Sequence, residues 1–128
     1  MRASEIMHEG IVEVSPELGL REFEELLTVE DISGAPVTGG DGKLLGIASK
    51  TDIVRSLSEE ASSNDELFGS ALTVEDIMTR EVVTVSPDED VKSIARHMID
   101  GQLHRVLVMR DSEVVGIVTA FDLLKLLC

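Results

Sequence analysis

Aromatic residues are nearly absent from this sequence, which has three phenylalanines, no tryptophan and no tyrosine. Proteins that bind single-stranded nucleic acid without sequence preference stack the bases on aromatic rings. Basic residues are also scarce: 11 lysines and arginines stand against 25 acidic residues, and none of the segments forms a basic stripe. A chain with a net charge of −14 is a poor partner for nucleic acid and for anionic membrane surfaces.

Cysteine is scarce, and long apolar runs are missing as well. Cys128 is the only cysteine, so an internal disulfide is excluded. None of the apolar runs approaches the length of a membrane span, and the N-terminus does not read as a signal peptide. These absences predict a soluble, cytoplasmic protein without a membrane partner. No His/Cys cluster has metal-ligand spacing and no nucleophile–base pair stands out, so neither a metal site nor an enzyme is predicted.

One seven-residue phrase occurs twice in the chain. Residues 46–52 read Gly-Ile-Ala-Ser-Lys-Thr-Asp, and residues 116–122 read Gly-Ile-Val-Thr-Ala-Phe-Asp. In each phrase a short aliphatic strand ends at a Ser or Thr that suits a helix N-cap, and an acid follows three residues later. That spacing is typical of a capping box. The phrase is therefore either a helix cap alone or a cap that also holds a ligand.

The rest of the chain repeats at the same offset of about 70 residues. Each copy has a short lead-in, a β-rich run, a helix opened by Ser-Pro with Ser as N-cap and Pro at the first helical position, two strands and a closing helix. Gly101 is predicted to end the second amphipathic helix, and Pro36 predicts an edge position or a strand start. The predicted ranges are lead-ins at 4–8 and 76–79, first strands at 11–14 and 82–85, middle strands at 35–37 and 106–108, third strands at 44–48 and 114–118, and closing helices at 51–57 and 120–127.

Two β-α-β-β-α repeats make an α+β fold, with the first repeat at 1–58, an acidic connector at 59–73 and the second repeat at 74–128. The connector either extends the preceding helix or loops over the surface. One repeat of about 55 residues buries too little surface to be secure. We therefore expect the two repeats to pack as a pseudo-twofold pair with a shared core.

The ordered motifs resemble a tandem pair of cystathionine-beta-synthase (CBS) domains, also called a Bateman module. The resemblance covers nearly the whole chain outside the connector. The second copy carries it most clearly, in residues 76–79 (Asp-Ile-Met-Thr), 85–87 (Val-Ser-Pro), 104–108 and 116–122. The first copy is looser but keeps the same order, in residues 5–7, 14–16, 34–37 and 46–52.

This resemblance implies a regulatory module that binds AMP, ADP, ATP or S-adenosylmethionine, has no catalysis or cofactor of its own, and reports the ligand to a separate partner protein. It implies that the Asp of the phrase accepts the ribose hydroxyls, that the Ser or Thr binds phosphate, and that residues of the other copy hold the base. Carried over, one predicted site consists of Ser49, Asp52, Thr79, Val83, Leu103, His104 and Arg105. The other consists of Thr119, Asp122, His8, Val12, Ile32, Ser33 and Gly34.

The chemistry of these residue types supports the same interpretation. Free N–H groups at a helix N-terminus suit phosphate, and an ionised Asp one turn later can accept both ribose hydroxyls. His104 and Arg105 add positive charge at one site, where the other has Ser33 and Gly34, so the Asp52 site is predicted to bind nucleotide better. The alternatives are that the phrases are only capping boxes, that His104 is a structural histidine, that Arg105 forms a surface ion pair, and that His8 lies on the surface.

The charge of −14 favours AMP or ADP over metal-free ATP, and cationic S-adenosylmethionine also suits it. The closing helix at 120–127 carries more apolar residues than one buried stripe needs, which predicts a homodimer interface. Two functions are therefore open: a sensor of adenosine ligands that regulates a partner, or a structural, protein-interaction member of the family with no physiological ligand.

Overall fold

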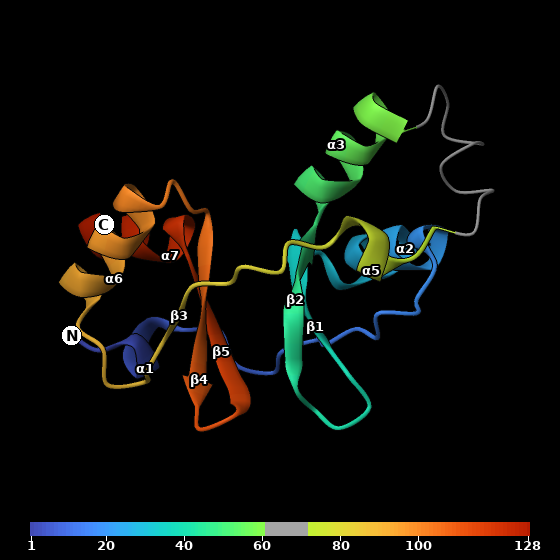
Figure 1. Cartoon of the computed structure of the whole chain (residues 1–128). Helices are drawn as coiled ribbons and strands as arrows, with labels where there is room; N and C mark the ends of the chain where they lie inside the picture. Colours follow the sequence, from blue (N-terminus) through green and yellow to red (C-terminus); the bar gives the residue numbers. More distant parts are fainter. Residues whose placement is uncertain (61–71) are drawn as a thin grey trace. The chain divides into compact units, whose positions relative to one another are not determined.

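The computed structural model describes residues 1–60 and 72–128, which form a mixed α+β fold as predicted. The chain divides into two compact units (Figure 1). Unit 1 contains Met1–Ile11 and Val82–Cys128, and unit 2 contains Val12–Glu81. The compact units are thus a different division of the chain from the sequence repeats, because each unit includes the lead-in of the other repeat.

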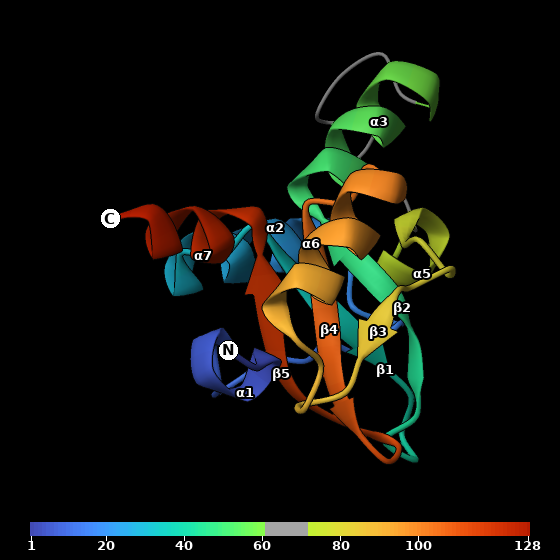
Figure 2. The ribbon, with the colours of Figure 1, turned by 90° about the vertical axis from the view of Figure 1, so that its left-hand side faces the viewer.

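Unit 1 is built on a three-stranded sheet in the order β3-β4-β5. Strand β3 is parallel to β4, and β4 is antiparallel to β5. Helices α6 and α7 pack against these strands and against each other, and α1 contacts β5 (Figure 2). The elements are α1 (Ala3–Ile6), β3 (Thr84–Val85), α6 (Val91–Asp100), β4 (Arg105–Arg110), β5 (Glu113–Thr119) and α7 (Ala120–Leu124), with a 3₁₀ turn at Lys125–Leu127.

Unit 2 is built on the antiparallel pair β1-β2, and α3 packs against α2 and α5. Its elements are α2 (Leu20–Glu30), β1 (Gly34–Thr38), β2 (Leu44–Ser49), α3 (Lys50–Glu60) and α5 (Val74–Ile77). No helix within the two described ranges is long and apolar enough to cross a membrane.

The buried apolar residues form two clusters, one in each unit, where a single shared core was expected; the amphipathic faces of α2 and α6 each contribute to the cluster of their own unit. Phe23 is fully buried in unit 2 and Ile94 is fully buried in unit 1. The unit 2 core comprises Val14, Leu20, Phe23, Leu27, Ala35, Val37, Ala48, Ile53, Val74 and Ile77. The unit 1 core comprises Ala3, Val85, Ile94, Met98, Val106, Val108 and Val118.

The two lead-ins are held by matching backbone bridges. His8 N–H donates to Ile117 O at 2.9 Å, and Ile117 N–H donates back to His8 O at 3.1 Å. In unit 2, Ile47 N–H donates to Thr79 O at 2.9 Å and Thr79 N–H donates to Ile47 O at 2.8 Å. Each lead-in therefore ends beside the strand that precedes a closing helix.

The predicted helix starts at Ser15-Pro16 and Ser86-Pro87 are wrong. Helix α2 has Gly19 as its N-cap, and α6 has Asp90, whose side chain accepts from Lys92 N–H. Each serine instead closes a tight turn, since Ser15 Oγ accepts from Glu17 N–H at 3.2 Å and Ser86 Oγ accepts from Asp88 N–H at 3.0 Å. The Ser15 hydroxyl also donates to the Glu17 carboxylate, which lowers the pKa of Glu17 below its usual value.

The predicted first strand at 11–14 does not form, and Pro36 supplies the reason. Val14 N–H donates to Pro36 O at 3.0 Å, which makes only an isolated bridge with β1. Proline has no N–H to extend this ladder toward Val12. At the matching position of the second repeat, Leu107 N–H donates to Val83 O at 3.3 Å, and the short strand β3 follows.

Other predicted ends are close to the observed ones. Gly101 is the C-cap of α6, as predicted. Helix α3 extends three residues past the predicted end at 57, to Glu60, and α7 gives way to the 3₁₀ turn after Leu124. The prediction of a connector at 59–73 falls mostly on residues 61–71, which lie outside the described residues.

Candidate functional site

Both seven-residue phrases form the predicted capping box. In unit 2, Asp52 Oδ2 accepts from Ser49 N–H at 2.8 Å and from Ser49 Oγ at 3.0 Å. In unit 1, Asp122 Oδ2 accepts from Thr119 N–H at 2.8 Å and from Thr119 Oγ1 at 3.0 Å. Both carboxylates are buried, and in each of them Oδ2 accepts two hydrogen bonds from the cap residue. The second oxygen, Oδ1, is the one that a ligand could use.

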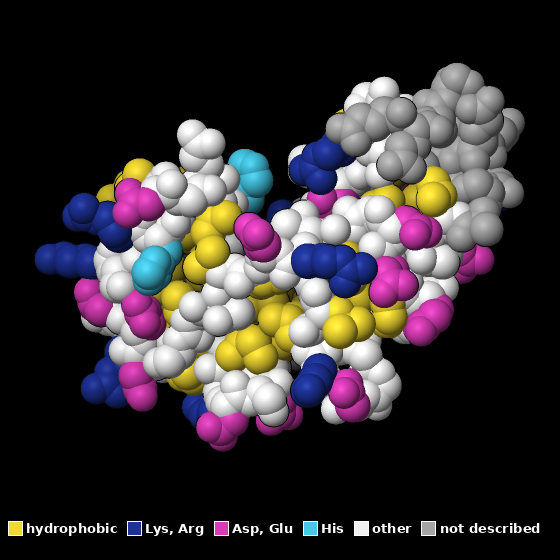
Figure 3. Space-filling model, viewed as in Figure 1, with side chains coloured by type: hydrophobic (Ala, Val, Ile, Leu, Met, Phe, Trp, Pro, Cys, Tyr) yellow, Lys and Arg dark blue, Asp and Glu magenta, His cyan; other side chains and the backbone are white. Residues whose placement is uncertain are grey.

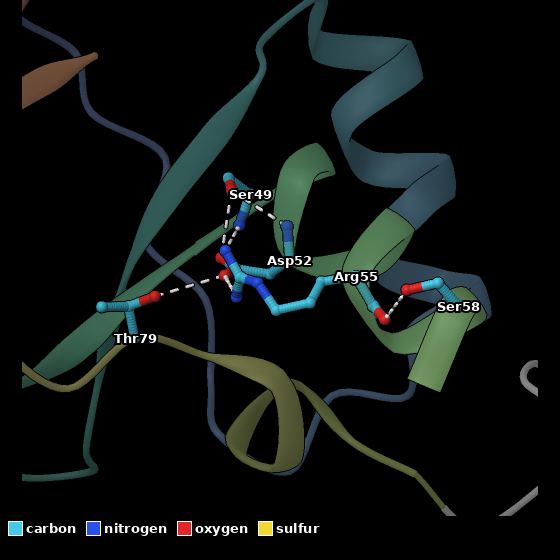
Figure 4. Close-up of polar contacts among 5 residues, drawn as sticks. All are labelled: Ser49, Asp52, Arg55, Ser58 and Thr79. Atoms are coloured by element: carbon cyan, nitrogen blue, oxygen red, sulfur yellow. Dashed lines mark hydrogen bonds and ion pairs between the residues drawn. The ribbon is translucent and has the colours of Figure 1, made fainter. Parts of the chain in front are cut away.

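Two side chains from unit 2 reach Asp52 Oδ1. Arg55 Nη1 lies 2.8 Å from this oxygen and Thr79 Oγ1 donates to it at 3.2 Å (Figure 4). Arg55 comes from the same helix as Asp52, and Thr79 follows α5 at the end of the lead-in. The buried carboxylate is therefore neutralised by a cation at its open side.

Asp122 has the corresponding arrangement with different residues. His8 Nε2 lies 2.6 Å from Asp122 Oδ1, and Lys125 Nζ lies 3.9 Å from the same oxygen. The His8 side chain is 59% exposed, whereas that of Asp122 is 3% exposed. His8 occupies the position of Thr79, and Lys125 occupies the position of Arg55.

Arg55 and Lys125 were not among the predicted site residues. Each follows the phrase Asp by three residues, so both copies carry a basic residue at the same place on the closing helix. A spacing of three places two side chains on the same helix face, where an acid and a base can pair. The repeat of this spacing in both copies was a signal that could have identified them.

The remaining predicted residues lie near the phrase of their own unit. Gly34 is paired with Ser49 across β1 and β2, and Arg105 is paired with Thr119 across β4 and β5. The backbone oxygen of Ser33 accepts from Lys50 N–H at 2.9 Å. In the same way, the backbone oxygen of His104 accepts from Ala120 N–H at 3.0 Å.

The predicted sites draw on residues of both units. Ile32 packs against the unit 2 core and Leu103 against the unit 1 core, while Val12 is partly buried and Val83 is exposed. It stays a prediction that one ligand site is formed by Ser49 and Asp52 with Val83, Leu103, His104 and Arg105. The second ligand site also stays a prediction, with Thr119, Asp122 and His8 joined by Val12, Ile32, Ser33 and Gly34.

The described residues satisfy their own buried polar groups. Among them, no buried side-chain nitrogen or oxygen lacks a hydrogen-bond partner. Asp52 Oδ1 already has two contacts, so a ligand that uses it replaces one of them, whereas Asp122 Oδ1 has the one hydrogen-bonding contact with His8. In residues 1–60 and 72–128 no group of three or more His, Cys, Asp or Glu side chains is placed to hold a metal ion.

A family model for the CBS domain matches residues 3–59 and 74–128. The chain belongs to the CBS domain family. An uncharacterized protein of Methanocaldococcus jannaschii is 28% identical over 123 residues, which cover 96% of this chain and 41% of that protein. The homoserine O-acetyltransferase of Methanohalobium evestigatum is 30% identical over 125 residues, covering 97% of this chain and 24% of the enzyme. The CBS chain thus spans less than half of the length of these two relatives.

The fold is also that of solved CBS domain pairs. The crystal structure of one such pair, in complex with 5′-methylthioadenosine and S-adenosyl-L-methionine, superimposes with a TM-score of 0.87 at 29% identity. The alignment covers 99% of this chain and 95% of that chain. The predicted tandem pair of CBS domains is therefore confirmed.

Proposed function

We propose that this chain is a regulatory module that senses an adenosine-containing ligand and controls a separate partner protein in the cytoplasm, without catalysis of its own. One observation carries the proposal: each repeat places a buried Asp, with one oxygen in a capping box, one turn into a closing helix. The similar CBS pair bound to two adenosine compounds supports the class of ligand.

The proposed ligand contacts follow from the chemistry of the phrase. Ribose hydroxyls donate to the Oδ1 atom of Asp52 or Asp122, which is a charged acceptor with a partly open side. A phosphate at the start of α3 would take the Ser49 hydroxyl in exchange for its present contact with Asp52 Oδ2. The proposal keeps the predicted contributions of both repeats to each site, and it takes AMP or ADP as the first candidates, with ATP and S-adenosylmethionine as the others.

A thermal-shift series with AMP, ADP, ATP, 5′-methylthioadenosine and S-adenosylmethionine tests the ligand class. At ten times its Kd, a ligand that binds only the folded chain adds about 1.4 kcal/mol to the free energy of unfolding. For a chain of this length we expect Tm to rise by about 5 °C. The Asp52→Ala/Asp122→Ala double variant is the control and should show no rise. If none of the five compounds raises Tm, the chain is instead a structural, protein-interaction member of the family.

The surface of the last helix favours assembly into a homodimer, which is part of this proposal. Phe121, Leu124 and Leu127 are 66%, 59% and 84% exposed. On the face in Figure 3, apolar side chains also lie among interspersed acidic and basic ones. Exposed apolar side chains gathered on one short segment are typical of an interaction surface.

Sedimentation at tens of micromolar should therefore show a dimer. We expect Leu124→Glu/Leu127→Glu to weaken the dimer about tenfold or more, because two charges would be buried without partners. Val29→Glu is a matched control, since Val29 is 80% exposed on α2 in unit 2. A monomeric parent chain, or equal weakening by the control, would count against this interface.

A further inference from the structure

We infer that Arg55 determines ligand specificity at Asp52, where it favours adenosine ligands with an anionic 5′ group over neutral or cationic ones. This inference rests on the proposed function and concerns the regulation of the same site. It starts from the ion pair between Arg55 Nη1 and Asp52 Oδ1, at 2.8 Å. The pair lies within unit 2, at the N-terminal end of an eleven-residue helix.

The two partners of this pair differ in freedom to move. The Arg55 side chain is 51% exposed, whereas the Asp52 side chain is 4% exposed. Asp52 is also fixed by its capping box with Ser49, so the guanidinium is the part that can shift. Figure 4 shows the guanidinium beside the Asp52 carboxylate, between Ser49 and Thr79.

Ribose binding at Asp52 competes with this ion pair. Oδ2 is occupied by the N–H and hydroxyl of Ser49, so ribose hydroxyls need Oδ1, which Arg55 and Thr79 contact. When the ribose takes this oxygen, the guanidinium loses an acceptor for its N–H groups. A phosphate at the start of α3 offers several acceptors that match the planar fork of arginine.

The charge of the 5′ group therefore decides whether the lost ion pair is replaced. A phosphate replaces it with charge-assisted hydrogen bonds. A methylthio group is neutral and gives the guanidinium nothing to accept its hydrogen bonds. S-adenosylmethionine carries a sulfonium and an ammonium, which repel the guanidinium, against a single carboxylate, so its net charge of about +1 disfavours it. Arg55 thus selects among compounds that share the same adenosine moiety.

Lys125 provides an internal comparison. Its Nζ lies 3.9 Å from Asp122 Oδ1 and 4.9 Å from the centroid of the Phe121 ring. The ammonium is thus beyond hydrogen-bonding distance of the carboxylate, and His8 holds the same oxygen at 2.6 Å. A ligand at Asp122 displaces His8 rather than Lys125, so we expect Lys125 to contribute little to specificity.

The test measures Kd by isothermal titration for AMP, 5′-methylthioadenosine and S-adenosylmethionine, on the full chain with Asp122→Asn as background. That background leaves Asp52 as the intact carboxylate. Because Arg55→Met removes the charge and keeps the length, it should weaken AMP about tenfold, the loss of one charge-assisted hydrogen bond. It should tighten 5′-methylthioadenosine and S-adenosylmethionine about threefold each, because neither ligand then has to break the ion pair with Asp52. Arg55→Lys should lie between, and Lys125→Met should change each Kd by less than about twofold.

The outcomes separate this inference from the proposed function. Equal weakening of AMP and 5′-methylthioadenosine by Arg55→Met would mean that Arg55 only positions Asp52, and the inference would be wrong. An unchanged AMP affinity would overturn it as well, while the binding of 5′-methylthioadenosine would leave the proposed function standing. If the parent chain binds none of the three compounds, the proposed function fails and this inference fails with it.

Discussion

Asp52→Ala is expected to weaken AMP binding about 100-fold, because two ribose hydroxyls lose a charged acceptor and each such bond contributes about 1.5 kcal/mol or more. Asp122→Ala is expected to weaken AMP binding less than about fivefold, because ligand at that carboxylate competes with the His8 hydrogen bond held at 2.6 Å. The two aspartates have the same capping-box geometry, so the expected difference in affinity comes from the surrounding side chains, first of all those around Oδ1.

The side chains around Oδ1 differ in how far they can move. The His8 side chain is short and its backbone is bridged to Ile117. Its imidazole therefore cannot move far from Asp122 toward another group of the ligand. Arg55 is long and half-exposed, and can move to a phosphate while staying near Asp52. The proposed contribution of His104 and Arg105 to the Asp52 site acts in the same direction. The Asp52 site is therefore expected to dominate AMP binding.

Isothermal titration on the single variants measures this ranking. Glu30→Ala is the matched control, since it removes one negative charge from unit 2 at an exposed position at the end of α2. Thermal melts without ligand show that each variant is folded at the titration temperature. Equal losses from both aspartate variants, or no loss from Asp52→Ala, would contradict the ranking.

Local patterns predicted the parts of the fold that short-range physics decides. The Ser49–Asp52 and Thr119–Asp122 spacings predicted capping boxes, and both form, because the hydroxyl, the carboxylate and the backbone N–H lie within one turn. The third strands end at Ser49 and Thr119, close to the predicted ranges, because a run of aliphatic residues around one glycine leads directly into each cap.

The Ser-Pro helix starts were predicted wrongly because the same residues also suit a tight turn. A serine oxygen can accept an N–H two residues later without any helix, and Ser15 and Ser86 both do so. The missing strand at 11–14 depends on Pro36, which lies more than twenty residues away in the sequence. A pattern confined to the strand itself does not include its hydrogen-bonding partner.

Arg55 and Lys125 can be identified as site residues only from the sequence repeat and the structure together. Arg55 on its own is one of many exposed basic residues on helices, and a pair with an acid three residues earlier is common. The structure adds that Arg55 contacts the buried Asp52 Oδ1 and that Lys125 has the same position in the other unit. Together these two facts identify Arg55 as a site residue.

Gly46→Ala is expected to lower the free energy of unfolding by about 3 kcal/mol, in the range for overpacking against a rigid neighbour. A Cβ at Gly46 would lie 2.6 Å from the backbone oxygen of Thr79. That oxygen accepts from Ile47 N–H at 2.9 Å, so it cannot move without breaking the bridge that holds the lead-in. The glycine of the phrase is therefore required by the close approach of another backbone.

Gly116→Ala is expected to cost less, about 1.5 kcal/mol, since the atoms nearest its Cβ belong to a flexible side chain. Met7 Sδ would be the atom nearest the new Cβ, with Met7 Cγ at 2.7 Å, and both can rotate away. Urea denaturation of each variant measures the difference. Gly40→Ala is the control, because its Cβ would meet nothing within 4 Å and it should change the free energy of unfolding by less than about 0.5 kcal/mol.

Losses of equal size at Gly46 and Gly116 would contradict this account, and so would a Met7→Ala background that failed to relieve Gly116→Ala. The Gly46 variant also connects the fold to the site. Thr79 supplies both the oxygen that the new Cβ would displace and the hydroxyl that contacts Asp52. Displacement of this lead-in should therefore lower AMP affinity in Gly46→Ala, while Gly116→Ala, which disturbs the lead-in next to His8, should affect AMP far less.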